Sequence, residues 1–214
     1  MSRQENPLEF QAIVSTLRNS LLILTFLATP TLAADRPEPA PSGHYIADVA
    51  HTSVTWKISH FGLSNYTARF VMAKAVLDWN AENPTLSKLK VEIDPSSVRT
   101  DFPAPQEEDF DRKIATDKAF LAGQPITFVA KTIEKTDDTH GRVTGDLTFR
   151  GQTHPVTMDV TFNGSFAKHP MEKVAKLGFS GTLVLDRTRW GLDFAIPALG
   201  RDVSVTIETE FAPE

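Results

Sequence analysis

The fold is decided by residues 145–156, which read Gly-Asp-Leu-Thr-Phe-Arg-Gly-Gln-Thr-His-Pro-Val. Leu147 and Phe149 alternate with polar residues ahead of Gly151, and the alternation resumes after the proline at Val156, Met158, Val160 and Phe162. Apolar residues at every second position are typical of strands with one buried face, and a glycine between two such runs is typical of a turn. The stretch therefore predicts a β-hairpin.

The same period of two recurs along most of the chain. It is found at Val54, Trp56, Ile58 and His60, at Leu89, Val91 and Ile93, at Ile126 and Phe128, at Leu177, Phe179, Leu183 and Leu185, and at Val203, Val205, Ile207 and Phe211. Consecutive strands joined by short turns usually pair antiparallel, and a meander of about eight strands closes into a barrel. We therefore predict an all-β fold, an extended antiparallel up-and-down (lipocalin-like) β-barrel of about eight strands.

Two segments depart from this regular pattern. Within residues 66–79 the apolar residues change parity, which predicts a bulge or a sharp bend in a long extended segment. Residues 106–122 begin with acidic side chains, carry Phe110 and Ile114 at helical spacing, and are followed by a glycine and a proline. Acidic residues at the start and glycine at the end are typical of a helix. We predict one helical segment there, lying over the barrel.

The N-terminal part has the features of an export signal. Residues 21–27 are apolar and are followed by small residues, so we predict a signal peptide over residues 1–33, cleaved near Ala33. The apolar run is shorter than the roughly 20 residues of a spanning helix. A buried helix or an uncleaved anchor is the alternative. We predict a proline-rich linker at residues 34–43 and the folded domain at residues 44–214.

The composition excludes several classes of function. The chain has a formal net charge of -5 and no cluster of basic residues, so we expect no nucleic-acid partner. It has no cysteine, which excludes disulfides, thiolate metal sites and a cysteine nucleophile. The 14 phenylalanines, against 2 tyrosines, put much of the apolar volume into rings without a polar group. Such rings fill a core or line a cavity for lipid.

The sequence carries no motif for catalysis or metal binding. It lacks a Gly-x-Ser-x-Gly elbow, a glycine-rich phosphate loop and a His-Glu-x-x-His helix. The six histidines have no tight ligand spacing, and only His51 and His60 would approach each other, across paired strands. We therefore expect no enzyme activity, no metal and no cofactor. An enzyme with scattered catalytic residues is the alternative.

A few polar residues are candidates for contact with a ligand head group. His60 shares the strand face of Trp56, which predicts either a histidine hydrogen-bonded to backbone at the edge of the core or a donor at a cavity mouth. Arg69, Arg187 and Arg189 are candidates to hold an anionic group, since guanidinium binds phosphate in a bidentate way. The alternative is a plain surface arginine, which we favour for Arg189.

Several local strings, taken together, resemble one known family. They are His-Thr-Ser-Val at 51–54, Ile-Ser-His-Phe-Gly at 58–62, Ile-Asp-Pro-Ser-Ser-Val-Arg-Thr at 93–100, Pro-Ile-Thr-Phe at 125–128, and the opening stretch. In these strings and in element order, residues 44–211 resemble the YceI-like family of periplasmic, lipocalin-like polyisoprenoid-binding proteins. The resemblance implies a barrel with an apolar tunnel for a long isoprenoid or similar chain, a flanking helical segment, export to the periplasm, and no catalysis.

On this basis we expect an exported, non-catalytic carrier for a long-chain amphiphile such as a polyisoprenoid or a quinone, bound as ligand rather than cofactor. The alternatives are an enzyme acting on such a lipid and a filled barrel that binds partners. A transient contact with a membrane or membrane protein is left open, as is the choice between monomer and homodimer. The predicted ligand-binding residues are Trp56, Ile58, His60, Tyr66, Arg69, Phe70, Val91, Phe110, Ile114, Phe120, Phe128, Leu147, Phe149 and Trp190.

Overall fold

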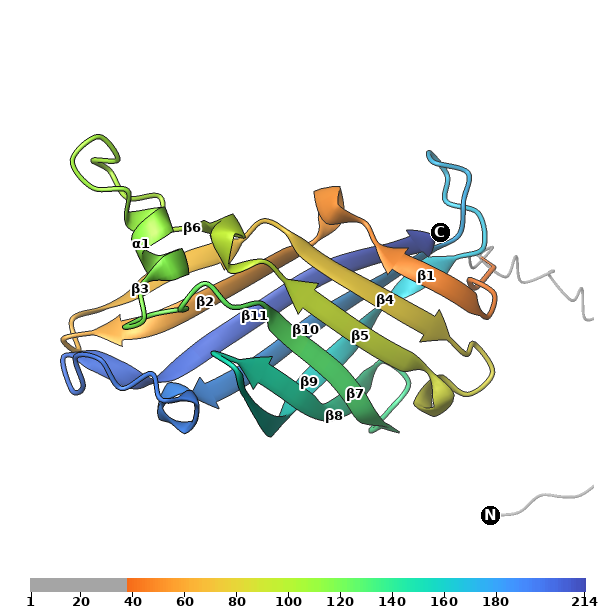
Figure 1. Ribbon diagram of the computed structural model, residues 1–214. Coiled ribbons are helices and arrows are strands. Elements are labelled where there is room, and N and C mark those ends of the chain that lie inside the picture. Colours follow the sequence, from red (N-terminus) through yellow and green to blue (C-terminus); the bar gives the residue numbers. More distant parts are fainter. Residues whose placement is uncertain (1–37) are drawn as a thin grey trace, which may run out of the picture. The chain divides into compact units, whose positions relative to one another are not determined.

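The computed structural model describes residues 38–214. The predicted signal peptide and the first part of the predicted linker lie outside the described residues. The strands and the α-helix, coloured along the chain in Figure 1, are β1 (Gly43–Ala47), β2 (Ser53–His60), β3 (Ser64–Phe70), β4 (Ala73–Trp79), β5 (Lys88–Ile93), β6 (Val98–Arg99), α1 (Phe110–Thr116), β7 (Ile126–Lys135), β8 (His140–Phe149), β9 (Gln152–Phe166), β10 (Lys176–Asp186) and β11 (Leu199–Pro213). Short 3-10 helices are η1 (Val49–His51), η2 (Pro84–Leu86), η3 (Pro95–Ser97) and η4 (Arg187–Trp190).

The strands form a closed antiparallel barrel. β11 pairs with β10 along one edge, while its other edge is shared by β2 and, further along, by β1. β3 and β4 then pair with β2 and β1, and β6 and β5 pair with β3 and β4. β1 and β2 therefore act as one long strand with a break, as do β3 with β4 and β5 with β6. Counted in this way, eight antiparallel strands follow one another around the barrel, and the predicted up-and-down fold is confirmed.

The hairpin predicted at residues 145–156 joins β8 to β9. Leu147 lies opposite His154 and Phe149 opposite Gln152. The turn between them is Arg150-Gly151, with φ angles of 50° and 72°. Two consecutive positive φ values are typical of the tight turns that match the twist of a hairpin. Upstream, a Cβ on Gly145 would stand 2.6 Å from the ring of Phe128, so the glycine leaves room for this ring against β8.

The predicted bend within residues 66–79 is also found. β3 ends at Phe70 and β4 begins at Ala73, and both of these residues are buried. Odd and even positions therefore exchange faces across the two intervening residues, one of which, Met72, is exposed. The break between β1 and β2 is made by η1, which Asp48 caps by accepting a hydrogen bond from the Ala50 amide at 3.0 Å.

The helix is shorter than the segment predicted at 106–122. α1 begins after Asp109, whose carboxylate accepts a hydrogen bond from the Arg112 amide at 3.0 Å. It ends at Thr116, because Asp117 is extended and Ala122 has a positive φ of 59° that a helix does not allow. The acidic residues ahead of Asp109 therefore precede the helix rather than form its first turn. α1 lies beside β2, β3 and β6 at one end of the barrel (Figure 1), where the Asp111 carboxylate accepts hydrogen bonds from the amide and hydroxyl of Thr100 at 2.7 and 2.5 Å.

The core has two parts. The larger cluster lies inside the barrel and includes Val54, Phe128 and Trp190, of which Trp190 is fully buried. The smaller cluster lies where β1 meets β11 and includes Tyr45, Leu177 and Phe211. Within residues 38–214, no helix has the length and hydropathy needed to cross a membrane.

Candidate functional site

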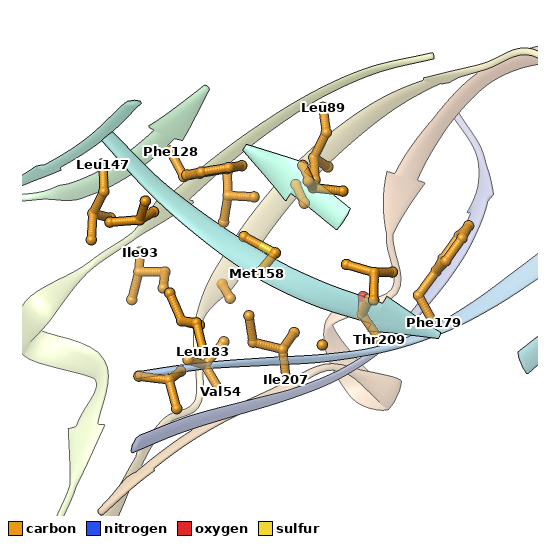
Figure 2. A pocket seen from close by; sticks show the side chains of 18 of the residues that line it. Val54, Leu89, Ile93, Phe128, Leu147, Met158, Phe179, Leu183, Ile207 and Thr209 are labelled. Atoms are coloured by element: carbon orange, nitrogen blue, oxygen red, sulfur yellow. The ribbon is translucent and has the colours of Figure 1, made fainter. Parts of the chain in front are cut away.

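The barrel encloses an apolar cavity of about 880 Å³. Inward side chains from strands all around the barrel border it, as Figure 2 shows for Val54 of β2, Ile93 of β5, Leu147 of β8, Met158 of β9 and Ile207 of β11. The alternation seen in the sequence produces this lining, because every second residue of a strand faces inwards. The filled barrel considered as an alternative is therefore not what the structure has.

The residues predicted to contact a ligand border this cavity, with one exception. Lining residues among them are Trp56, Ile58, His60, Tyr66, Phe70, Val91, Phe110, Ile114, Phe120, Phe128, Leu147, Phe149 and Trp190. Arg69 is not among the lining residues. Its guanidinium is half exposed and pairs with the Asp101 carboxylate at 3.0 Å.

Aromatic rings connect the cavity to the helix. The ring centroids of Trp56 and Tyr66 are 6.3 Å apart, and those of Tyr66 and Phe110 are 6.1 Å apart. Phe110 in turn contacts Phe102 in the loop before α1, at 5.3 Å. Burial raises the pKa of Tyr66, and its hydroxyl donates to the carbonyl oxygen of Thr100 at 3.4 Å. α1 and its preceding loop thus cover one side of the cavity with rings in tilted and edge-to-face contact.

The cavity wall carries few polar groups along its middle. The hydroxyls of Thr52 and Thr209 bond to each other at 2.8 Å. Nε1 of Trp190 donates to the carbonyl oxygen of Leu147 at 3.4 Å. Among the described residues, Trp56 Nε1 and His154 Nε2 are buried and have no hydrogen-bond partner. A buried donor left without an acceptor costs about 1–3 kcal/mol.

The candidate head-group arginines have other roles. Arg187 borders the cavity but is buried, and it donates to the carbonyl oxygens of Gly200, Leu192, Phe194 and Leu199 at 2.7, 2.7, 2.9 and 3.2 Å. Burial lowers its pKa. Arg187 is therefore not the plain surface arginine considered as the alternative, and its donors organise the loop before β11. Arg189 is exposed, which agrees with the surface arginine favoured from the sequence. Its guanidinium lies over the ring of Trp190, 5.2 Å from the ring centroid.

The turn of the opening hairpin fixes the loops near α1. Arg150 donates to the carbonyl oxygen of Lys118 at 2.7 Å, to that of Trp190 at 3.1 Å, and to that of Phe120. One side chain therefore joins the segment after α1, η4 and the β8–β9 turn. No local pattern predicts this role of Arg150, because its partners are main-chain atoms 30 to 40 positions away.

Exposed apolar side chains lie on two loops, the β2–β3 turn and the β10–β11 loop. We define the apolar rim as Phe61, Leu63, Phe194 and Ile196, which are 62%, 88%, 49% and 37% exposed. The two loops that carry it are joined by a hydrogen bond from the Phe61 amide to the Ala198 carbonyl at 2.6 Å. His60 is exposed beside it, with its ring edge-on to Phe61 at 4.7 Å. His60 thus lies at a cavity mouth rather than in the core.

A charged cluster that the sequence did not predict lies near η1. The ligand atoms of Asp48, His51, Glu172 and Glu210 are within 4.8 Å of one another, a spacing that suits a metal ion. However, the buried ammonium of Lys176 lies 2.7 Å from Asp48, 2.8 Å from Glu172 and 3.6 Å from Glu210. Lys176 therefore supplies the positive charge that a metal ion would bring to these carboxylates. His51 and His60 do not approach each other, because they flank opposite ends of β2.

The cluster has a clear electrostatic signature. Hydrogen bonds from Lys176 and then His51 hold the pKa of Asp48 well below its usual range. Burial alone would lower the pKa of Lys176, but hydrogen bonds to Asp48 and Glu172 outweigh it and raise the pKa. The hydrogen bond to Asp48 also raises the pKa of His51. The cluster is therefore a network of opposite charges that joins η1 to β10 and β11.

Solved structures share this barrel. YceI of Campylobacter jejuni is 26% identical with a TM-score of 0.63, and the match covers 73% of this chain and 90% of that one. BcnA of Burkholderia cenocepacia is 17% identical with a TM-score of 0.65 over 77% of this chain and 98% of that one. A polyisoprenoid-binding domain from Saccharophagus degradans is 11% identical with a TM-score of 0.58, covering 79% of this chain and 98% of that one.

Two sequence relatives match over nearly their whole length. A UPF0312 protein of Staphylococcus epidermidis is 31% identical over 173 residues, 77% of this chain and 95% of the relative. Another, from Pseudomonas syringae pv. tomato, is 32% identical over 198 residues, 90% of this chain and 97% of the relative. The family model for the YceI-like domain matches residues 45–211, which is the barrel from β1 to β11. The chain therefore belongs to the YceI-like domain family.

Proposed function

We propose that this protein binds a long-chain amphiphile, such as a polyisoprenoid or a quinone, inside the barrel and does not transform it. The observation that carries the proposal is the apolar cavity of about 880 Å³, bordered by side chains from strands around the whole barrel. Burying a chain of methylenes there gains about 0.8 kcal/mol for each, which gives strong binding without covalent chemistry. The polyisoprenoid-binding domain of Saccharophagus degradans, which has the same fold, supports this class of ligand.

We further propose that the protein works as a carrier outside the cytoplasm. The support is the apolar run at residues 21–27 with the small residues after it, which is typical of a cleaved export signal. Cleavage near Ala33 would leave the mature barrel in the periplasm. Expression of the full chain in a Gram-negative host, with N-terminal sequencing of the periplasmic fraction, tests this. Recovery of the uncleaved chain in the cytoplasm or membrane would contradict it.

We propose that the ligand is exchanged at the apolar rim. Exposed apolar patches beside a pocket often mark contact with a membrane or another protein. The rim side chains are carried by the β2–β3 turn and the β10–β11 loop, and Phe194 also borders the cavity. A lipid that leaves a bilayer at this point therefore meets apolar side chains along its whole path.

Native mass spectrometry of detergent-free protein tests the binding proposal. After incubation with a polyprenyl alcohol or a long-chain quinone, we expect one bound lipid on each chain. Protein that stays empty under both conditions would contradict the proposal. Recovery of the lipid unchanged after long incubation separates binding from the enzyme alternative, which requires a product.

A further inference from the structure

We propose that the bound lipid chain passes Gly181, midway along β10, and that this glycine decides how long a chain the cavity accepts. The inference rests on the proposed function and specifies the ligand of the same site. Gly181 is the middle residue of β10 and borders the cavity. The inward-facing residues on either side of it, Phe179 and Leu183, carry large side chains that line the cavity (Figure 2). The wall therefore has a gap between two large side chains.

The cavity continues on both sides of Gly181. In one direction it is bordered by Leu183 and reaches Phe194 in the β10–β11 loop. In the other direction it is bordered by Phe179 and reaches Thr139 in the β7–β8 turn. A chain that fills the whole cavity must therefore pass the level of Gly181.

The backbone at Gly181 does not require a glycine. Gly181 is not among the residues with a positive φ, and the bulge in the β9–β10 pairing lies before Phe179. A Cβ on Gly181 would stand 3.6 Å from Cβ and 3.7 Å from Cδ1 of Ile207, which is ordinary van der Waals contact. Glycine weakens the interior of a strand and often marks a bulge, a bend or the close approach of a ligand or another backbone.

Gly141, at the start of β8, shows the contrast. A Cβ there would stand 2.5 Å from the carbonyl oxygen of Glu134 on the paired strand, so this glycine lets two backbones approach. At Gly181 the nearest main-chain atom of another strand is the carbonyl oxygen of Asp159, 3.9 Å from a Cβ. The close approach of a ligand is therefore the role that suits Gly181.

A side chain at position 181 would point into the cavity. Residues directly opposite one another on antiparallel strands share a face. Gly181 lies opposite Val160 on β9 and Ile207 on β11, and both of these residues border the cavity. The next residue, Thr182, is exposed on the outer face. A leucine at position 181 would therefore take up cavity space, whereas a leucine at position 182 would not.

The distance from the α1 end sets the chain length that Gly181 controls. Ile207, opposite Gly181, pairs with Val54 on β2. Val54 lies six residues before His60 at the cavity mouth, roughly 20 Å along an extended strand. A short isoprenoid alcohol such as farnesol fits on one side of Gly181, whereas the much longer solanesol must pass it.

These two alcohols, which differ in chain length but not in head group, test the role. Detergent-free protein is equilibrated with phosphatidylcholine vesicles that contain one alcohol, and native mass spectrometry measures the amount bound. The proteins are wild type, Gly181→Leu, Gly181→Val and the matched control Thr182→Leu. Each alcohol is compared between variant and wild type, so that its affinity for the vesicle cancels.

We expect wild type and Thr182→Leu to bind both alcohols. Gly181→Leu should bind farnesol as the wild type does, but solanesol at least about tenfold more weakly. The part of the solanesol chain beyond the new side chain would stay in water, and burial of about two methylenes already changes affinity tenfold. Gly181→Val should show the same preference to a smaller extent, and valine suits a strand better than glycine does.

Thermal unfolding shows which variants are folded. Normal binding of solanesol by folded Gly181→Leu and Gly181→Val would overturn the inference, because the chain would then not pass Gly181. Loss of both alcohols from these folded variants would overturn it too, since the effect would not depend on chain length. Failure of both variants to fold would contradict the free space at position 181. Wild-type protein that binds neither alcohol would instead refute the proposed function, and this inference with it.

Discussion

The ammonium of Lys176 lies 2.7 Å from the carboxylate of Asp48, although 128 positions separate the two residues in the sequence. This contact ties the break between β1 and β2 to the start of β10. Because β1 and β2 share the same edge of β11, the charged cluster around Lys176 holds the barrel together where one of its long strands is interrupted.

Replacing Asp48 by asparagine should change how stability depends on pH. The pKa of Asp48 is lowered in the folded protein from an ordinary value of 3.8, so its stabilising contribution is complete above about pH 4 and is lost as the pH falls below that value. Asp48→Asn should remove this acid-sensitive contribution and lower the unfolding free energy at pH 7 by about 1–3 kcal/mol, since Lys176 keeps Glu172 as a partner.

Denaturant unfolding between pH 2 and 8 measures the effect, with Asp202→Asn on the exposed face of β11 as control. Parallel pH profiles for wild type and Asp48→Asn would show that this carboxylate does not support the fold.

Replacing Arg187 by lysine should destabilise the protein despite the kept charge. A lysine cannot reach the four carbonyl oxygens that the guanidinium fork satisfies. We expect the unfolding free energy to fall by about 2–3 kcal/mol. Arg189→Lys, next to it and exposed, should change it by less than about 0.5 kcal/mol. An equal effect of the two substitutions in thermal unfolding would argue against the buried network.

Replacing Phe128 by alanine should weaken ligand binding more than folding. Phe128 borders the cavity, so removing its ring should cost less than the roughly 3–5 kcal/mol typical of a filled core. Affinity for a polyprenyl alcohol should fall clearly. The neighbour Val129 points outwards and is 38% exposed, so Val129→Ala should leave affinity unchanged. A loss of unfolding free energy as large as in a filled core, with unchanged affinity for the lipid, would contradict a role of Phe128 in the cavity wall.

Replacing Leu63 by serine should slow lipid transfer without changing affinity. Leu63 is the most exposed side chain of the apolar rim, so the substitution removes apolar contact with a bilayer but no contact with a bound lipid. Transfer of a fluorescent polyprenyl lipid from phosphatidylcholine vesicles should slow several-fold. Val184→Ser makes a similar change at an exposed position on the barrel wall and should transfer normally. Equal rates for all three proteins would place lipid exchange elsewhere.

The strands were predictable because their signal is local. One-sided burial repeats at every second residue, so the face of Val54, Trp56 and Ile58 could be assigned before any contact was known. The same rule gave the cavity lining, since a barrel turns one face of each strand inwards. The β8–β9 turn was equally local, because a glycine between two alternating runs marks a hairpin.

The helix limits and the charged contacts were not predictable in this way. α1 ends at Thr116 because the chain is extended at Asp117, although helical spacing alone would allow a longer helix. Lys176 and Arg187 look like surface residues in the sequence, and their partners lie in distant segments or on the main chain. Burial of a charge depends on which segments the fold brings together, and no local pattern encodes that.

Arg150 gives the mouth of the barrel a kinetic property. Its guanidinium joins the segment after α1, η4 and the β8–β9 turn, so no one of these can detach without breaking hydrogen bonds shared with the others. Segments coupled in this way open as one cooperative unit with a single free energy. A bound lipid that leaves past α1 would therefore wait for one concerted opening, and its residence time would depend on a hairpin turn that never touches it.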